Sequence, residues 1–520
     1  MPSLRYQQVE DWIRQGIREQ RWHTGERLPS IRTLCQQFDV SKITVQHAFQ
    51  RLEAQRLIEA RPRSGYFVLE PDSRTTVVAE LRLPVSVSAT VPEPSGVTVH
   101  TLLLDVMERG AAFDVCPPAV NHTEPDPLDA NTGQLPRLNA RLVSNPADAR
   151  QRDAGLTALN RSLGRALRRQ QSQHHSYYDQ PAGDAQLRFQ IVERYRRRAT
   201  PLDIQDICIT NGCQHSLFLA LMSVCKAGDV VAVEAPGFYG VLQLLEQLQL
   251  NVIEIPASAA HGMDMDALAQ ALMRWPIQAV VITPAFATPT GALLPDNARR
   301  QLMALAEQHD LAIIEDDIYA ETAFNPTSHS GAELLPSPLK ALDYRQPGDQ
   351  QPGHQQRVIL CGSYSKCLSK DLRLGWIAGG RWHEKILRLK LVSQLASSRS
   401  QQQGLADFIE DGGLLRHLKR YRQTLRQQRD ELLHHLRDWP IDTPAIPEGG
   451  LTLWLTLPDA IETLPLYQRA QTHGVAITPG PLFSASGQFQ NNLRLSYAHP
   501  WTSVRIQALQ TLRDLIEDSA

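Results

Sequence analysis

The sequence predicts a winged helix-turn-helix at the N-terminus, a linker, and a large α/β domain that ends in a smaller α+β lobe. Three observations predict this: helix and turn patterns over residues 1–70, a stretch rich in Pro, Ser, Thr and Val over 71–105, and apolar strands alternating with amphipathic helices over 106–520. A chain of 520 residues is long enough for three or four folding units. The strand and helix rhythm favours a mostly parallel sheet covered on both faces.

The composition is typical of a globular protein in water. Hydrophobic residues make up 42% of the chain and charged residues 21%, and no apolar run has the length of a membrane span. The first residues lack the pattern of a secretion signal, so we expect a cytoplasmic location and no membrane partner. The seven cysteines are scattered, without the spacing of a zinc knuckle or redox dipeptide. We therefore expect reduced thiols and no metal site.

The first 70 residues form the basic part of the chain, and helical spacing predicts three helices there. They hold eleven Lys/Arg and eight Asp/Glu, although the net charge of the whole chain is −2. The expected inward-facing residues of the three helices are Tyr6, Val9, Ile13 and Ile17; Ile31, Leu34, Cys35 and Phe38; and Val45, Ala48, Phe49 and Leu52. Ser30 and Ser41 are the expected caps of the second and third helices. Residues 57–69 predict two short strands around a turn, which would be the wing.

This module has the residues of a DNA-binding surface. In a helix-turn-helix, side chains near the start of the second helix of the motif reach bases or phosphates in the major groove. We expect these contacts from Ser41, Lys42, Thr44 and Gln46, with Arg32 on the preceding helix and Arg61 and Arg63 on the wing. The alternative is a winged helix that binds protein and exposes a solvated basic face.

Residues 4–69 resemble the winged-helix domain of the GntR family. The resemblance rests on YQQVEDWIRQGI, GERLPSIRTLCQQFDVSKITVQHAFQRLEAQRLI and RSGYFV. It implies that Arg32, Lys42, Thr44 and Gly65 belong to the operator-binding surface. Lys42 stands where the family more often has Arg, and a lysine is a point charge, so a phosphate contact is expected from it.

In the large domain, Lys366 has the setting of a reactive lysine. It follows an apolar strand that ends near Ser363, in CGSYSKCLSKDLRLGW. A lysine desolvated at a strand end can form a Schiff base with an aldehyde cofactor. The alternative is an ordinary loop lysine.

Four other segments carry polar or aromatic groups that suit a phosphorylated aromatic cofactor. ITNGCQHSLFLAL joins a strand to a helix at Gly212 and Cys213, where backbone amides can bind an anion. IIEDDIYAE ends a strand at two aspartates, one of which could hold a pyridinium nitrogen protonated, unless both simply face solvent. Further contacts are expected from Ser363, Arg373 and Phe238, and Arg494 could bind a ligand carboxylate.

Residues 150–500 resemble the fold-type I aminotransferases, in which these elements occur in the same order. The resemblance implies pyridoxal 5′-phosphate (PLP) as cofactor, held by Lys366 as an internal aldimine. It implies that Asp316 pairs with the pyridine nitrogen, Tyr319 approaches the 3′-oxygen and Phe238 stacks on the ring. The implied phosphate contacts are Gly212, Cys213, Ser363 and Arg373. Tyr178 in SYYDQPAGDAQLR matches a tyrosine that reaches the phosphate of the neighbouring subunit, which implies a homodimer.

The combination of the two domains resembles the MocR subfamily of bacterial regulators. It implies a PLP-dependent regulator of transcription that binds operator DNA and senses an amino compound or PLP itself in the large domain. The aminotransferase resemblance implies that Arg494 binds the carboxylate of a substrate or effector. Two positions depart from the aminotransferase pattern: Thr288 replaces a common Asn before Pro-Thr-Gly, and Lys370-Asp371 replaces a usual Pro-Gly. Thr288 can still contact the cofactor oxygen but offers no amide to a carboxylate. The alternatives are a working aminotransferase with an attached DNA-binding module and a scaffold that binds DNA without cofactor.

Overall fold

The computed structural model describes most of the large domain and part of the N-terminal module. The described residues are 154–172, 178–325, 335–343, 356–442 and 445–519, the single positions 106 and 115, and, near the N-terminus, 9, 12–13, 15–16, 21–23, 25–38, 40, 44–45, 48–49, 52, 58–61 and 65–68. The chain divides into two compact units, 1–90 and 91–520. The linker expected over 71–105 lies outside the described residues, so its boundaries stay a prediction. No helix in the described part is long and apolar enough to cross a membrane.

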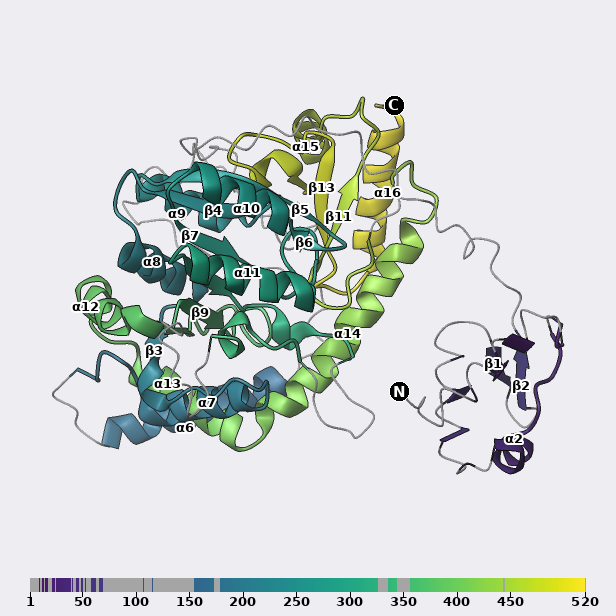
Figure 1. Ribbon diagram of the computed structural model, residues 1–520, viewed down its shortest axis with the longest axis horizontal. Coiled ribbons are helices and arrows are strands. Elements are labelled where there is room, and N and C mark those ends of the chain that lie inside the picture. The colour runs from purple at the N-terminus through teal and green to yellow at the C-terminus, as the bar shows by residue number, and fades with distance from the viewer. Residues whose placement is uncertain are drawn as a thin grey trace, which may run out of the picture. The chain divides into compact units, whose positions relative to one another are not determined.

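The N-terminal unit has the predicted winged-helix elements. Helix α2 (Ile31–Phe38) begins after Ser30, whose hydroxyl accepts the N–H of Thr33 at 3.2 Å. Strands β1 (Ile58–Arg61) and β2 (Gly65–Val68) pair antiparallel and form the wing (Figure 1). The rings of Phe49 and Tyr66 stack with centroids 4.3 Å apart, which joins the helical part to the wing. The fully buried core residues include Val9, Ile13, Leu34, Val45, Ala48, Phe49 and Leu52, all of them predicted to face inward.

The large unit is built on an eight-stranded sheet with the order β3-β10-β9-β8-β7-β4-β5-β6. Its strands are β3 (Ile207–Thr210), β4 (Val230–Ala235), β5 (Asn251–Ser258), β6 (Gly262–Met263), β7 (Ile277–Ile282), β8 (Ala312–Asp316), β9 (Val358–Ser363) and β10 (Gly375–Ala378). The central pairs are parallel, whereas β10 runs antiparallel to both β3 and β9, and β6 antiparallel to β5. The mostly parallel sheet is confirmed. The apolar pattern did not predict β6 and β10.

Alternating side chains of the strands pack on two helical layers. One layer contains α8 (Cys213–Val224), α9 (Tyr239–Gln247) and α12 (His383–Ser393), and it covers residues such as Val231, Val281 and Ile314. The other contains α10 (Met265–Arg274) and α11 (Asp296–Gln308), which cover Val280 and Ile313. Helices α6 (Ala154–Ser172), α7 (Ala185–Arg196) and α13 (Arg399–Glu410) pack together beside β3 and β10. Burial of both sheet faces explains the nearly continuous apolar strands.

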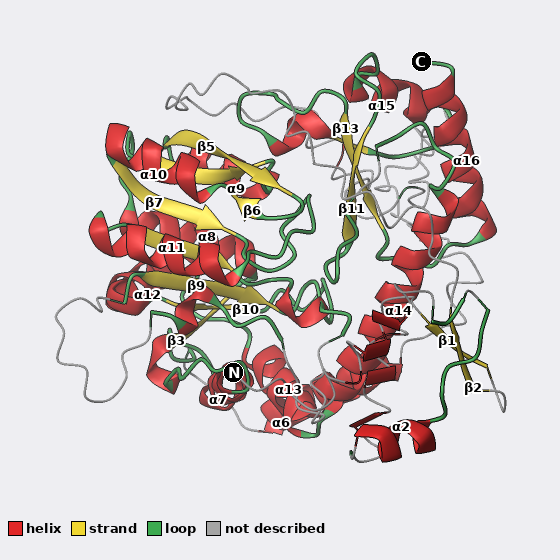
Figure 2. Ribbon diagram, turned by 45° about the vertical axis from the view of Figure 1, so that its right-hand side comes forward, coloured by secondary structure: helices red, strands yellow, loops and turns green. Residues whose placement is uncertain are grey.

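The C-terminal lobe has a three-stranded antiparallel sheet in the order β11-β13-β12. Its elements are β11 (Thr452–Thr456), α15 (Thr463–Thr472), β12 (Thr478–Pro479), β13 (Asn492–Ser496) and α16 (Ser503–Glu517). The long helix α14 (Gly413–His435) shares the core of this lobe through Leu425 and Leu432. The predicted strand at VAITP is reduced to the two residues of β12. Figure 2 shows the lobe facing the carboxyl ends of the parallel strands.

Candidate functional site

Several parallel strands of the large sheet end in polar residues at one edge. β8 ends at Asp316 and β9 at Ser363, and the loop after β7 carries Thr288. Gly212 follows β3, and Phe238 lies between β4 and α9. The carboxyl ends of strands in such sheets form the crevice where ligands bind. The sequence-predicted residues of the large domain, apart from Tyr178 and Arg494, therefore gather at the edge of the sheet, and the C-terminal lobe, which carries Arg494, faces that edge (Figure 2).

Asp316 is a buried carboxylate at this edge. Its side chain is 4% exposed and accepts a hydrogen bond from the thiol of Cys213 at 3.1 Å. Burial raises the pKa of Asp316 to about 6, while the Cys213 bond and the charge of Lys366 oppose the rise. A carboxylate in this state attracts a cationic or protonated partner.

The neighbouring carboxylate, Asp317, is engaged elsewhere. It forms a buried ion pair with Arg198, whose Nη2 donates to its Oδ1 at 2.8 Å. The hydroxyl of Tyr195 also donates to it, at 2.8 Å. Successive side chains of a strand point to opposite faces, which separates the two aspartates. Asp317 is thus part of the framework, and Asp316 is the aspartate that faces the site.

Lys366 lies three residues beyond the end of β9 and is half-buried. Burial lowers the pKa of Lys366 to about 7, and the positive charges of Lys370 and Arg494 lower it further, whereas Asp316 opposes the change. The hydroxyl of Tyr421 donates to the Lys366 carbonyl at 3.1 Å and fixes the backbone there. Near neutral pH a large share of the amine is therefore unprotonated and nucleophilic.

The start of α8 and the loop after β9 form a cup of anion-binding groups. Gly212 precedes α8 with φ of 84°, and no side chain caps the helix, so its first N–H groups remain available for an anion. A Cβ at this position would lie 2.8 Å from Nη2 of Arg373, so only glycine lets the guanidinium approach. Ser363 is buried, and its hydroxyl lies 2.9 Å from that of Ser365.

Arg494 enters the site from β13 and is 5% exposed. Its Nη1 lies 3.5 Å from the hydroxyl of Thr288, and its Nη2 lies 3.4 Å from that of Thr478. The rings of Tyr239 and Phe483 flank the guanidinium at 5.7 and 5.0 Å. These contacts hold the fork of the guanidinium in one orientation, as carboxylate binding requires.

Tyr319 and Phe238 complete the site. Tyr319 is buried, and burial raises the pKa of its phenol, while Arg494 and a hydrogen bond with Thr288 oppose the rise. Phe238 is half-buried, and a Cβ at Gly240 would lie 2.5 Å from its ring, so the ring packs against that glycine. A phenol thus lies near the Asp316 carboxylate, and the loop between β4 and α9 provides an aromatic face.

Tyr178 does not join this cluster within the chain. Its side chain is 81% exposed, on the segment before α7. The next residue, Asp179, lies 3.7 Å from Arg399 in an ion pair. An exposed tyrosine on an anchored segment can contact another molecule.

Half of the predicted DNA contacts lie at described positions. Arg32 is in α2, Thr44 is helical and half-buried, and Arg61 pairs with Gly65 at the closed end of the wing. Ser41, Lys42, Gln46 and Arg63 lie outside the described residues.

Sequence reasoning missed three neighbours of Arg494, namely Thr478, Tyr239 and Phe483. Thr478 pairs with Arg494 across the small sheet, a register that the sequence does not reveal. It also missed the bond between Cys213 and Asp316, which joins residues 103 positions apart. Among the described residues, no group of three His, Cys, Asp or Glu side chains could hold a metal ion.

Comparison with known proteins adds two family matches. The family "Aminotransferase class I and II" matches residues 144–510, and "Bacterial regulatory proteins, gntR family" matches residues 5–68. The HTH-type transcriptional regulators YjiR and YdcR of Escherichia coli are each 32% identical, over 98% and 99% of both chains. The chain is also similar to the crystal structure of LysN, an α-aminoadipate aminotransferase of Thermus thermophilus, complexed with N-(5′-phosphopyridoxyl)-L-leucine. The TM-score is 0.62 at 27% sequence identity, and the match covers 70% of this chain and 88% of that one.

The two matches together cover the DNA-reading and the aminotransferase-like parts in one chain, as the sequence motifs predict. Full-length similarity to regulators of the same organisation supports the same conclusion. The chain belongs to the MocR subfamily of GntR-family transcriptional regulators, in which a winged helix is joined to an aminotransferase class I and II domain.

Proposed function

We propose that this regulator binds PLP at the site formed by the carboxyl ends of the large sheet and Arg494. We propose further that its operator binding changes when an amino compound, or PLP itself, occupies that site. The observation that carries the proposal is the convergence of Lys366, Asp316, Tyr319 and Arg494 from three separate segments, since Asp316 and Tyr319 share one. The LysN complex with a phosphopyridoxyl compound lends support from a similar structure.

The residues of the site fit this cofactor. The amine of Lys366 suits the aldehyde of the cofactor, and the buried carboxylate of Asp316 suits its pyridine nitrogen. The uncapped start of α8, with Arg373 close to it, suits the phosphate. Lys366 would hold the cofactor covalently, and Asp316 would keep its nitrogen protonated. The phosphate would be bound by Gly212, Cys213, Ser363 and Arg373. When bound, PLP supplies an electrophilic carbon and an electron-withdrawing ring.

The remaining contacts concern the ring and the effector. Phe238 would stack on the ring, while Tyr319 and Thr288 would contact its oxygen. Arg494 would bind an effector carboxylate through its fixed guanidinium, with Tyr239 and Phe483 flanking it. The effector would act by binding two arrangements of the protein with different affinity.

The operator-binding surface in this proposal comprises Arg32, Ser41, Lys42, Thr44, Gln46, Arg61, Arg63 and Gly65. Basic side chains near the helix start and on the wing neutralise phosphates, which releases counterions. Lys42 would contact phosphate. The protein would work in the cytoplasm, where operator DNA lies.

We further propose a homodimer with shared sites. Tyr178 is largely exposed, and so are Leu391, Val392 and Leu395 near the end of α12, with Val392 at 89%. Exposed apolar side chains that are grouped together, as these three are in sequence, favour an interaction site. Tyr178 would then reach the phosphate of the neighbouring subunit, and a two-fold pair of winged helices would match a two-fold operator.

The test of the proposal is the visible absorption of the full-length protein after incubation with PLP, before and after borohydride reduction. We expect an imine band that reduction makes permanent, and no such band in Lys366→Ala with unchanged circular dichroism. A normal band in Lys366→Ala would place the attachment at another lysine and overturn the assignment.

A second candidate function, transamination, is favoured by the presence of Lys366, Asp316 and Arg494 together. Thr288 weakens it, because a hydroxyl offers fewer hydrogen bonds than an amide. Single-turnover and multiple-turnover assays with amino donors and a keto acid decide between the two. Regulation requires only exchange at the cofactor, whereas an enzyme completes many turnovers.

A further inference from the structure

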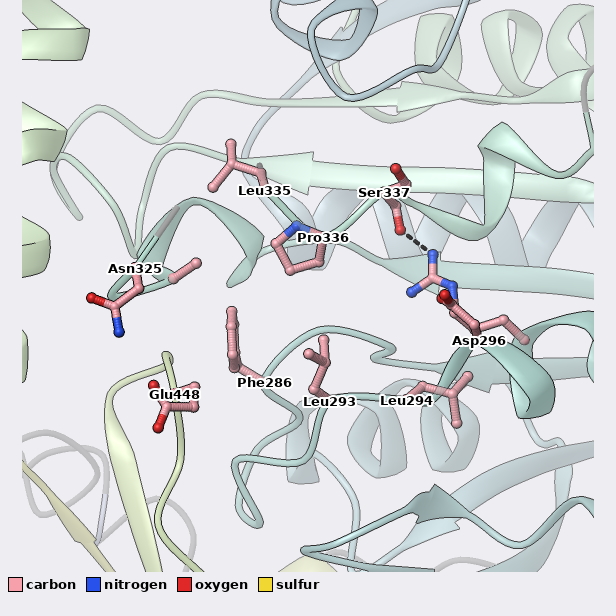
Figure 3. A pocket seen from close by; sticks show the side chains of 11 residues that line it. Phe286, Leu293, Leu294, Asp296, Asn325, Leu335, Pro336, Ser337 and Glu448 are labelled. Carbon is pink, nitrogen blue, oxygen red and sulfur yellow. Dashed lines mark hydrogen bonds between the residues drawn. The ribbon is translucent and has the colours of Figure 1, made fainter. Parts of the chain in front are cut away.

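The large domain contains a pocket that the proposed cofactor site does not use. Its volume is about 440 Å³, and no residue of the cofactor site lines it. Volumes between about 300 and 1,000 Å³ are usual for small-molecule sites. Figure 3 shows Leu335 and Pro336 on one side of the pocket and Phe286, Leu293 and Leu294 on the other. The middle of the pocket is therefore apolar.

The buried charge of the pocket wall is Arg299. This residue is 5% exposed, and one of its five N–H donors binds the Ser337 carbonyl, which fixes the guanidinium in place (Figure 3). The acidic residues of the lining, Asp296 and Glu448, are exposed, and the Glu448 side chain is 67% accessible to water. Water screens exposed charges far more than buried ones. The buried carboxyl of Glu315 also lies within electrostatic reach of Arg299, but it does not line the pocket, and burial raises its pKa to about 7, which weakens its opposing charge. Arg299 is therefore the strongest charge of the pocket lining.

We propose that this pocket is a second ligand site, which takes an apolar monocarboxylic acid. The carboxylate would bind Arg299, and the hydrocarbon part would pack between Phe286 and Pro336. A guanidinium fixed beside an apolar surface suits such a ligand, because it binds a carboxylate with two parallel hydrogen bonds.

The walls of this pocket belong to segments that also carry cofactor-site residues. Phe286 lies two residues before Thr288 and has a left-handed φ of 54°, which leaves its backbone little freedom. A Cβ at Gly449 would lie 2.5 Å from its ring, so the ring has no room to turn on that side. A ligand that displaces Phe286 therefore also displaces Thr288.

A second wall connects to Tyr319. Ala323 follows the short turn Ala320–Thr322, which begins directly after Tyr319. The Thr322 hydroxyl donates to the Tyr319 carbonyl at 2.6 Å and accepts the N–H of Gly450 at 2.8 Å. Occupancy of the pocket thus acts on Thr288 and Tyr319 together, and changes the surroundings of the cofactor oxygen.

The binding test uses 3-phenylpropionate, which has no amine and cannot attach to the cofactor. Isothermal titration calorimetry on the full-length protein should give saturable binding with a dissociation constant on the order of 1 mM, as for ligands of this size. Leu293→Trp should fill the mouth and weaken binding at least about tenfold. The matched control is Leu342→Trp, since Leu293 and Leu342 are 42% and 43% exposed and only Leu293 lines the pocket. No saturable binding, or equal loss in both variants, overturns the proposal.

A second comparison separates this site from Arg494, which also binds carboxylates. Binding should persist in Arg494→Ala and fall at least about tenfold in Arg299→Gln, because a charged hydrogen-bonded pair is lost. The reverse pattern overturns the proposal. Benzyltrimethylammonium has a similar apolar part and the opposite charge, so it should not compete. The control for Glu448 is Glu307, which is also exposed but lies on α11 outside the pocket lining. If benzyltrimethylammonium competes, and Glu448→Gln removes this competition while Glu307→Gln does not, the pocket binds cations and the proposal is overturned.

The coupling is tested in Arg494→Ala loaded with PLP. Saturating 3-phenylpropionate should shift the visible absorption of the cofactor, and Leu293→Trp in the same background should abolish the shift. Binding without any spectral change would leave a ligand site but overturn the coupling. Failure of PLP attachment, by contrast, would contradict the proposed function and leave the calorimetric result intact.

Discussion

Removing the positive charge of Lys370 should slow PLP attachment to Lys366 at neutral pH and leave it unchanged at high pH. The pKa of Lys366 is about 7, and the charge of Lys370 is the main cause of this low value after burial. Without that charge the pKa rises, because the protonated amine is no longer repelled. Only the unprotonated amine attacks an aldehyde, so the rate follows its fraction.

Lys370 is exposed, so water screens its charge, and the magnitude is that of two like charges about 4 Å apart in water, about 1 kcal/mol. At pH 7 the amine of the wild-type protein is about half unprotonated, given its pKa of about 7. A change of about 1 kcal/mol alters the protonation equilibrium about fivefold, which lowers the unprotonated fraction to about one sixth. The Lys370→Met variant should therefore react about threefold more slowly at pH 7 and at the wild-type rate at pH 9.

The assay is the rate at which the imine absorption appears after PLP is mixed with cofactor-free protein, between pH 6 and 9. The wild-type rate should rise through pH 7, where the amine loses its proton, and then level off. Lys419→Met is the control, since Lys419 is exposed on α14. The reasoning is refuted if Lys370→Met keeps the wild-type pH profile, or if the rate falls equally at all pH values, as a steric effect would cause.

Three further predictions concern the other assignments. Asp316→Asn should weaken PLP binding and shift the absorption of the bound cofactor. Asp317→Asn should leave the spectrum unchanged but lower the free energy of unfolding by about 3–5 kcal/mol, because the buried charge of Arg198 loses its partner. Denaturant titration and spectra of both variants distinguish the two roles. Arg32→Ala and Lys42→Ala should each weaken operator binding and reduce its salt dependence by about one counterion, measured by fluorescence anisotropy at several salt concentrations; unchanged slopes would remove both residues from the interface. Arg494→Ala should keep operator binding but lose the response to an amino-acid effector. The affinity of the effector should fall tenfold or more, because the charged hydrogen bonds to its carboxylate, worth about 1.5–3 kcal/mol, are lost. An undiminished response would mean that the effector lacks a carboxylate or binds elsewhere.

The strands that the sequence predicted are those with long apolar runs, because both faces of the sheet are buried. β10 was missed since its four residues, Gly375–Ala378, contain an apolar run of only three residues and directly follow the polar loop of Lys366. β12 is shorter than expected because only Thr478 and Pro479 pair with β13. Local pattern thus predicts an element, whereas its length depends on partners from elsewhere in the chain.

The site was predictable as a set of strand ends, but the orientation of its side chains was not. Sequence alone could not choose between Asp316 and Asp317 without the family resemblance. The choice depends on Arg198 and Tyr195, which lie about 120 positions earlier and bind Asp317. The flanking of Arg494 by Tyr239 and Phe483 likewise joins distant segments. Contacts of this kind come from tertiary packing and leave no periodic signal.

The order of the strands around the site has a consequence for the folding of the chain. Gly212, Asp316 and Arg494 come from the edge strand, the middle of the large sheet and the C-terminal lobe. A chain that has not completed both sheets therefore cannot assemble the full site, and PLP should bind only the folded state. By mass action, the melting temperature should then rise with PLP concentration. At a PLP concentration of one hundred times the dissociation constant, the free energy of unfolding should increase by about 2.7 kcal/mol. Cofactor supply would in this way set how much regulator survives in the cell, independently of any effector.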